Sequence, residues 1–139
     1  MLDQRIISPS NSDYASRVVL VKKKYGTMRF CVDYRDLNDI TIKDGFPLPL
    51  IDDLIYSLQG CRYISTFDFH SGFWQIPIAE KDRHKTAFIT TSGLYQFSVL
   101  PFGLTNSPAT YQRMINKVFD QYNWSFVLAY LDDNNSKNI

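Results

Sequence analysis

Two runs of apolar residues end in aspartate, and this feature constrains the fold of the chain more than any other. Residues 126–131 lead directly into Asp132 and Asp133, and residues 63–67 lead into Asp68. We expect both runs to be β-strands. Strands that deliver carboxylates at one end can build a site for hard divalent cations, and such a site supports nucleotidyl transfer.

A purely structural interpretation of these aspartates stays open. Asp132 and Asp133 can begin a surface loop after a buried strand, and Asp68 can be a cap or turn residue. Adjacent residues on a strand point to opposite faces, so Asp132 and Asp133 can face one metal pair only if the backbone turns there. Without a cation, clustered carboxylates raise one another's pKa, and their grouping therefore favours a metal site.

Strand-like and helix-like patterns alternate along the rest of the chain. We predict a β-hairpin from residues 18–22 and 28–33, a short helix at residues 50–58 ended by Gly60, a turn at Ser71 and Gly72, a second hairpin from residues 86–90 and 95–100, and a loop at residues 101–106. This mixture predicts an α+β fold with an antiparallel sheet and packed helices.

A longer helix is expected to begin at Ser107, which would be its N-cap, with Pro108 at the first helical position. Its apolar residues keep helical spacing, and we expect them to pack one face on a sheet. They are Tyr111, Ile115, Val118, Phe119 and Tyr122.

Basic residues concentrate in one part of a chain whose net charge is only +1. Between residues 17 and 35 there is a single acid, Asp33, against the basic residues Arg17, Lys22, Lys23, Lys24, Arg29 and Arg35. A local basic patch suits a phosphate-bearing ligand. A solvated hairpin with lysine on an edge strand explains the same pattern equally well.

Length, cysteine usage and the absence of targeting patterns limit the possible domain number, cysteine chemistry and location of the protein. With 139 residues and 45% apolar content, the chain can form one domain, or part of one, with a buried core. Cys31 and Cys61 lack the paired spacing of a zinc site, so we expect both to be buried, reduced thiols. The sequence shows neither a membrane-spanning apolar stretch nor a signal-peptide pattern, which predicts an intracellular protein.

Several stretches of the chain, in order and at similar spacing, resemble the reverse transcriptase domain of Ty3/gypsy-type long-terminal-repeat retrotransposons and related retroviral Pol proteins. They are residues 10–16, 19–24, 29–38, 46–49, 67–75, 100–112 and 130–133. The similarity extends from about residue 8 to residue 133. It is therefore far more specific than residues 130–133 alone.

The resemblance implies a right-hand polymerase, of which this chain holds the fingers and most of the palm. The implied activity is that of an RNA-directed DNA polymerase, which adds dNTP to a primer 3′ end with two Mg²⁺ ions, for which Mn²⁺ can substitute. Asp68, Asp132 and Asp133 would be the catalytic, metal-binding carboxylates. The implied partners are an RNA or DNA template with its primer, dNTP, and the thumb and RNase H parts of a Pol polyprotein, with no membrane partner.

The resemblance also implies residues that hold the incoming triphosphate. Lys23 and Arg29, in the fingers hairpin, would bind the phosphates, Arg29 through bidentate contacts and Lys23 as a point charge. Ser71 and Gly72 would offer backbone N–H groups to the same phosphates. The alternative is that Ser71 and Gly72 form only a turn.

Four further residues receive roles from the resemblance. Phe73 would block a 2′-hydroxyl and so select dNTP over rNTP, and Phe102 and Gly103 would line the nucleotide pocket. Gln112, on the helix that follows, would contact the template. The alternatives are that Phe73 belongs to the core and that Gln112 is an ordinary exposed helix residue.

The domain organisation follows from the same resemblance. We expect residues 1–12 to be a loosely held lead-in and residues 13–139 to be a reverse transcriptase domain with fingers and partial palm. The resemblance implies an apolar strand after Asp133, whereas residues 134–139 are mostly polar, and we expect the thumb, connection and RNase H portions to be missing from this chain. We therefore expect the chain alone to polymerise poorly, in the cytoplasm or, in an active element, within a virus-like particle.

Two other functions explain part of the sequence. A catalytically dead relic, or a Pol fragment kept to bind nucleic acid, explains the basic hairpin and predicts salt-dependent affinity without metal dependence. An unrelated Mg²⁺-dependent phosphotransferase explains the aspartates but neither the hairpin nor residues 100–112.

Overall fold

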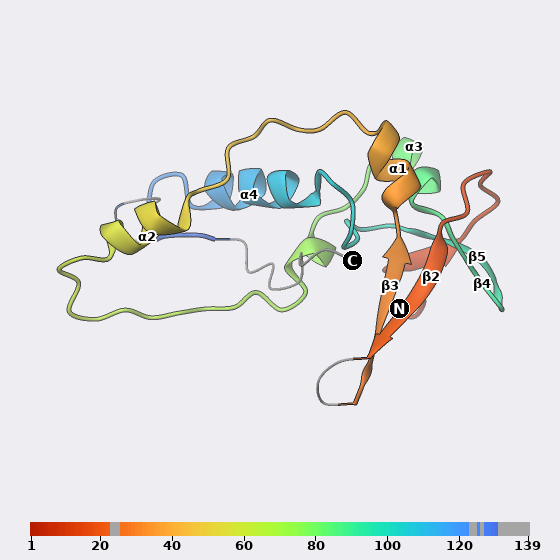
Figure 1. Ribbon diagram of the computed structural model, residues 1–139, viewed down its shortest axis with the longest axis horizontal. Helices are drawn as coiled ribbons and strands as arrows, with labels where there is room; N and C mark the ends of the chain where they lie inside the picture. Colours follow the sequence, from red (N-terminus) through yellow and green to blue (C-terminus); the bar gives the residue numbers. More distant parts are fainter. Residues whose placement is uncertain (23–25, 123–124, 126, 131–139) are drawn as a thin grey trace. The chain divides into compact units, whose positions relative to one another are not determined.

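The computed structural model describes residues 1–22, 26–122, 125 and 127–130 (Figure 1). The chain divides into a first unit, Met1–Lys43 with Ser71–Ser107, and a second unit, Asp44–His70 with Pro108–Ile139. Helices and antiparallel strand ladders together make up the structure, as the predicted α+β class requires. Within the described part, no helix is long and apolar enough to cross a membrane.

The hairpin predicted between residues 18 and 33 is confirmed. β2 (Arg17–Lys22) pairs antiparallel with β3 (Met28–Asp33), from Arg17 opposite Asp33 to Lys22 opposite Met28 (Figure 1). Gly26 lies between the strands at φ 83°, a left-handed conformation that glycine adopts without steric cost. The helix α1 (Arg35–Ile40) follows β3 almost directly.

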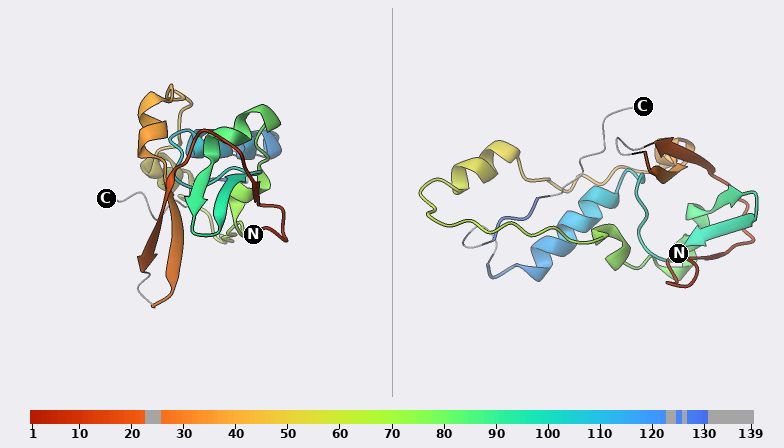
Figure 2. Two further views of the ribbon diagram at one scale, coloured as in Figure 1. Left: turned by 90° about the vertical axis from the view of Figure 1, so that its right-hand side faces the viewer. Right: turned by 90° about the horizontal axis from the view of Figure 1, so that it is seen from below.

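A second sheet in the first unit has the strand order β1-β5-β4. β4 (Phe88–Thr90) and β5 (Gly93–Phe97) form the second predicted hairpin, seen as two green-cyan arrows in Figure 2, with shorter strands than expected and a two-residue connection. β1 (Ile7–Pro9) pairs antiparallel with β5. The expectation of a loosely held lead-in is therefore wrong for residues 6–9, because strand pairing and the burial of Ile6 attach them to this sheet.

The core of the first unit is built on the buried side chains of Ile6, Phe88 and Phe97. Partly buried residues from both sheets and from the connecting segments pack on it: Ile7, Val18, Val32, Trp74, Ile78, Tyr95 and Val99. Phe30 adds an edge contact to the Phe88 ring, with centroids 5.4 Å apart. Because side chains alternate across a strand, the opposite face of β3 carries Arg29.

Three short helices precede β4, after the chain returns to the first unit at Ser71. They are the 3₁₀ helix η1 (Gly72–Gln75), α3 (Glu80–Arg83) and the 3₁₀ helix η2 (His84–Thr86). Thr86 is buried, and its hydroxyl donates to the Arg83 carbonyl at 2.7 Å and accepts the Phe97 N–H at 2.9 Å. The first bond holds η2 against the end of α3, and the second joins η2 to Phe97, a core residue of β5.

The second unit contains α2 and all of α4 except its first residue. α2 (Ile51–Ser57) lies inside the predicted range, and Gly60 follows it at φ 85°. α4 (Ser107–Val118) lies where the longer helix was predicted, but Ser107 is its first helical residue and not its N-cap, and the Ser107 hydroxyl donates to the Pro101 carbonyl at 3.0 Å. Of its predicted apolar face, Tyr111 and Ile115 are buried, whereas Val118 and Tyr122 are exposed. The helix ends at Val118, so Tyr122 and the partly buried Phe119 lie beyond it.

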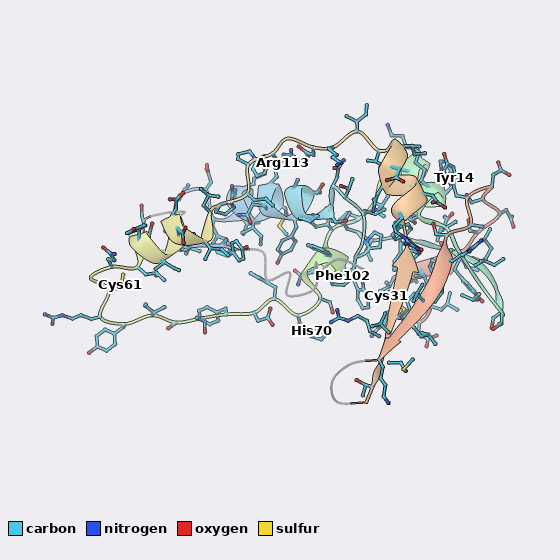
Figure 3. The ribbon with its side chains drawn as sticks, viewed as in Figure 1. Tyr14, Cys31, Cys61, His70, Phe102 and Arg113 are labelled. Atoms are coloured by element: carbon cyan, nitrogen blue, oxygen red, sulfur yellow. The ribbon has the colours of Figure 1, made fainter. Side chains whose placement is uncertain are left out.

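An ion pair joins the start of the second unit to α4. Arg113 donates to both carboxylate oxygens of Asp44, at 2.9 and 2.8 Å, and its guanidinium lies 4.6 Å from the centroid of the Phe46 ring (Figure 3). The hydrogen bonds from Arg113 hold the pKa of Asp44 below its ordinary value.

The strand predicted from residue 63 to Asp68 is not formed. These residues are irregular, and Phe67 is 89% exposed. A strand needs a neighbour for its backbone hydrogen bonds, and no described residue pairs with this segment. The other predicted strand that leads into aspartates, residues 126–131, lies partly outside the described residues, within which Val127 takes part in a β-bridge.

The two cysteines differ from each other in exposure. Both thiols are free, as predicted, and Cys31 is partly buried on β3 (Figure 3). Cys61 is exposed, so the prediction that it is buried is wrong. The residue lies in the connection after α2, which contributes nothing to a core.

Candidate functional site

Phe73 and Phe102 lie against each other in the first unit, with ring centroids 4.9 Å apart and planes inclined at 39°. Phe73, on η1, is 6% exposed. Phe102, which is labelled in Figure 3, lies in the loop after β5 and is 53% exposed. Trp74 makes a further edge contact with Phe102, at 6.4 Å between centroids. The structure therefore brings together two of the residues predicted to form the nucleotide pocket.

Ser71 and Gly72 form the turn that leads into η1, as predicted. Ser71 has φ 52° and ψ 47°, a left-handed conformation that is uncommon for residues other than glycine. Its carbonyl accepts the Trp74 N–H at 2.9 Å, which closes the turn. Backbone held in such a conformation is often found at functional sites.

The loop that carries Phe102 is held by Asn38 of α1. The Asn38 Nδ2 group donates to the Gly103 carbonyl at 2.8 Å, and its Oδ1 accepts the Thr105 N–H at 2.8 Å. Asn106 adds a bond from its Nδ2 to the Ile42 carbonyl at 2.9 Å. Sequence reasoning assigned no role to Asn38, because no local pattern reports contacts that span 65 positions or more.

Arg29 lies on β3 opposite Val21, on the face turned away from the core, and Lys23 lies outside the described residues. Another cation of the basic patch is paired. Arg35 donates from Nη2 to Asp33 Oδ2 at 2.6 Å and from Nε to Asp33 Oδ1 at 2.9 Å. These bonds lower the pKa of Asp33 from 3.8 to about 2, so Asp33 stays charged and offsets part of the patch.

Of the three aspartates predicted to bind metal, the structure describes only Asp68. Asp68 lies in the second unit with an exposed side chain. Burial, with a smaller contribution from the negative charge of Asp68, raises the pKa of Tyr111. Asp132 and Asp133 lie outside the described residues, and across the remaining chain no three His, Cys, Asp or Glu side chains gather as a metal site would require.

Gln112 has a different environment from the one predicted for a template contact. Its side chain is 2% exposed on α4. The Nε2 group donates to Asn116 Oδ1 at 2.9 Å and to the Ala129 carbonyl at 3.2 Å. In this structure Gln112 therefore connects α4 to residues 127–130.

Comparisons with known proteins agree with these motifs. A family profile described as reverse transcriptase (RNA-dependent DNA polymerase) matches residues 21–135. The chain is 43% identical over 138 residues to the retrovirus-related Pol polyprotein from transposon 297 of Drosophila melanogaster, covering 96% of this chain and 13% of that polyprotein. It is also 43% identical over 107 residues to the RNA-directed DNA polymerase homolog of Oenothera berteroana, covering 77% of this chain and 75% of that protein.

A solved structure has a similar fold. The foamy viral protease-reverse transcriptase in complex with RNA/DNA hybrid superposes with a TM-score of 0.85 and 25% sequence identity. The match covers 94% of this chain and 17% of the viral chain. The chain thus corresponds to a small part of the long polyproteins that it resembles.

Proposed function

The chain belongs to the reverse transcriptase (RNA-dependent DNA polymerase) family, and from this premise we propose that it is the part of a retroelement Pol polyprotein that performs RNA-directed DNA synthesis. The observation that carries the proposal is the family match over residues 21–135, a range that includes Asp68, Asp132 and Asp133. The foamy viral enzyme was solved with an RNA/DNA hybrid, which supports a template–primer duplex as the ligand. In this proposal residues 13–139 are fingers and partial palm.

Asp68, Asp132 and Asp133 are the proposed ligands for two Mg²⁺ ions, with Mn²⁺ as a substitute. The donor type fits, because Mg²⁺ prefers carboxylate oxygens and Asp68 presents an exposed carboxylate. When bound, such cations lower the pKa of a primer 3′-hydroxyl and neutralise charge on the triphosphate. The aspartates supply the negative charge that holds them.

The remaining residues would bind and orient the nucleotide. Arg29, which is partly buried on β3, and Lys23 would pair with the triphosphate, and the backbone of Ser71 and Gly72 would donate to it. The Phe73 and Phe102 pair with Gly103 would line the sugar side of the pocket and select dNTP over rNTP. Gln112 would reach a template only by giving up its bonds to Asn116 and Ala129, which favours a supporting role.

Metal-dependent nucleotide binding tests this proposal. Titration calorimetry of the 139-residue chain with dATP should show binding in MgCl₂ and none in EDTA. Asp68→Asn and Asp133→Asn should each weaken this binding by at least about tenfold. The matched control is Asp120→Asn, an exposed aspartate outside the motifs, which should leave binding unchanged.

Primer extension on an RNA template is the corresponding measurement of activity, and Asp133→Asn should abolish any extension observed. Nucleotide binding that is independent of Mg²⁺ and of Asp68 would contradict the proposal. If that result came with strongly salt-dependent nucleic-acid affinity, the chain would be a binding module instead.

A further inference from the structure

We propose that residues 61–69 are a self-association site, at which two copies of this chain pair as antiparallel strands with Ser65 opposite the partner's Ser65. The occupant of this segment is therefore a second copy of the chain. This inference goes beyond the proposed function and does not depend on it, since it concerns how the chain associates with itself.

The first argument is the exposure of the segment. Every residue from Cys61 to His70 is exposed, and the chain runs as an extended trace between these two labelled residues in Figure 3. The side chains of Tyr63 and Phe67 are 95% and 89% exposed. In the part of the chain that the structure describes, no strand pairs with residues 61–69. An unpaired segment with exposed apolar side chains is a template for a partner strand.

The second argument is that the segment is complementary to itself. An antiparallel pair centred on Ser65 places Arg62 opposite the partner's Asp68, and Asp68 opposite the partner's Arg62. On the other face of the pair, Tyr63 lies opposite the partner's Phe67. Opposite charges and aromatic rings that face each other across two strands stabilise a sheet. A two-fold axis forms each of these contacts twice.

Charge disfavours two other arrangements of the same segment. In a parallel pair that is in register, Arg62 would face the partner's Arg62, and Asp68 would face the partner's Asp68, so like charges would repel. An antiparallel pair centred on Thr66 would place Ile64 opposite the partner's Asp68 and would leave that carboxylate without a cation. The pair centred on Ser65 gives each charge an opposite charge as its neighbour.

Analytical ultracentrifugation in EDTA, where no cation competes for Asp68, measures the association over a series of protein concentrations. We expect a weak, reversible dimer, because an isolated pair of strands has marginal stability in water. Arg62→Asp and Asp68→Arg should each raise the dimer dissociation constant by about tenfold or more, since either change puts like charges at both ends of the pair. An equimolar mixture of the two variants should dimerise as the unsubstituted chain does, because every charge again faces its opposite.

A cysteine at the two-fold axis tests the register directly. Ser65→Cys, made together with Cys61→Ser, should form an intermolecular disulfide with oxidised glutathione, because the two new thiols face each other. Thr66→Cys in the same background is the matched control. It should form much less disulfide, since its side chain faces the partner's Ile64 and not its own copy. Peptide mapping identifies the bond.

Several outcomes would overturn the inference: an unsubstituted chain that stays monomeric at every concentration, an Arg62→Asp variant that dimerises equally well, or a mixture of folded charge variants that stays monomeric. Hydrogen exchange that shows residues 61–69 protected in the monomer would also overturn it, because the partner strand would then lie in the same chain. Circular dichroism checks that each variant folds, and the Ser65→Cys comparison serves if a charge variant does not. Loss of Mg²⁺-dependent dATP binding would contradict the proposed function alone.

Discussion

The hydroxyl of Tyr34 donates a hydrogen bond to the backbone carbonyl of Thr86 at 2.9 Å, and both residues are buried. Tyr34 follows β3 directly, and Thr86 ends η2, so the bond joins segments 52 positions apart. Burial raises the pKa of Tyr34, which keeps the phenol protonated and able to donate. This single contact links the β2–β3 hairpin to the segment that leads into β4.

We expect Tyr34→Phe to lower the free energy of unfolding by about 1–2 kcal/mol, because the Thr86 carbonyl loses a buried donor. Urea denaturation followed by circular dichroism measures the change. Tyr95→Phe is the matched control, since the Tyr95 hydroxyl makes only a 3.4 Å contact with the Ser92 carbonyl at an exposed position. If both variants lost the same free energy of unfolding, the Tyr34 hydrogen bond would contribute no more to stability than the exposed Tyr95 contact.

A second prediction concerns the backbone at Gly103, which has φ 94°. Gly103→Ala should destabilise the chain by about 1–2 kcal/mol, because L-residues with a side chain are strained in this conformation. A Cβ atom there would lie 3.5 Å from the Tyr34 ring and 3.5 Å from the Val32 carbonyl, which is ordinary contact, so strain is the main cost.

The control for this prediction is Gly45→Ala. A Cβ at Gly45 would meet no atom within 4 Å, and its φ is outside the left-handed range. This substitution should be neutral, or stabilise slightly through the unfolded state. A Gly103→Ala variant as stable as Gly45→Ala would mean that the loop relaxes without cost.

The fold could be predicted from the sequence where local pattern decides the structure. β2 and β3 are runs of β-prone residues on either side of Gly26, and α2 repeats leucine or isoleucine at helical spacing. β1 could not be found in this way, because a strand of three residues carries little pattern and its partner, β5, lies about 90 positions away. Residues 63–69 have the composition of a strand, but strand formation needs a neighbour that composition does not report.

The candidate site was predictable to a similar extent. Motif resemblance identified Phe73 and Phe102 as members of one pocket, and their ring contact is consistent with that. The order of burial, with Phe102 outside, depends on tertiary packing that no motif encodes. The metal-binding roles of Asp68, Asp132 and Asp133 stay predictions, since two of the three lie outside the described residues.

A third prediction concerns acid stability. The hydrogen bonds from Arg35 place the pKa of folded Asp33 at about 2, below its ordinary 3.8. A carboxyl whose pKa is lower in the folded state stabilises the fold above its unfolded pKa, and this contribution is lost as the pH falls through the folded pKa. The free energy of unfolding should therefore fall between these two pH values, and less steeply in Asp33→Asn than in the unsubstituted chain.

Acid titrations of thermal unfolding measure this slope. Because the Arg35 side chain is 75% exposed, salt should also reduce the contribution. Asp120→Asn leaves the Asp33–Arg35 pair intact and should keep the slope of the unsubstituted chain. Identical slopes for Asp33→Asn and the unsubstituted chain would show that the ion pair does not persist in solution.

The last prediction separates two roles for Gln112. Because its amide is buried and donates to Asn116 and to the Ala129 carbonyl, Gln112→Leu should lower the free energy of unfolding by about 1–3 kcal/mol. Gln59→Leu, at an exposed position after α2, is the matched control and should have little effect. A residue whose only role is to touch the template would instead leave stability unchanged and weaken nucleic-acid binding. Since Ala129 lies three positions before Asp132, loss of this bond should also weaken Mg²⁺-dependent dATP binding without changing the preference for dATP over ATP.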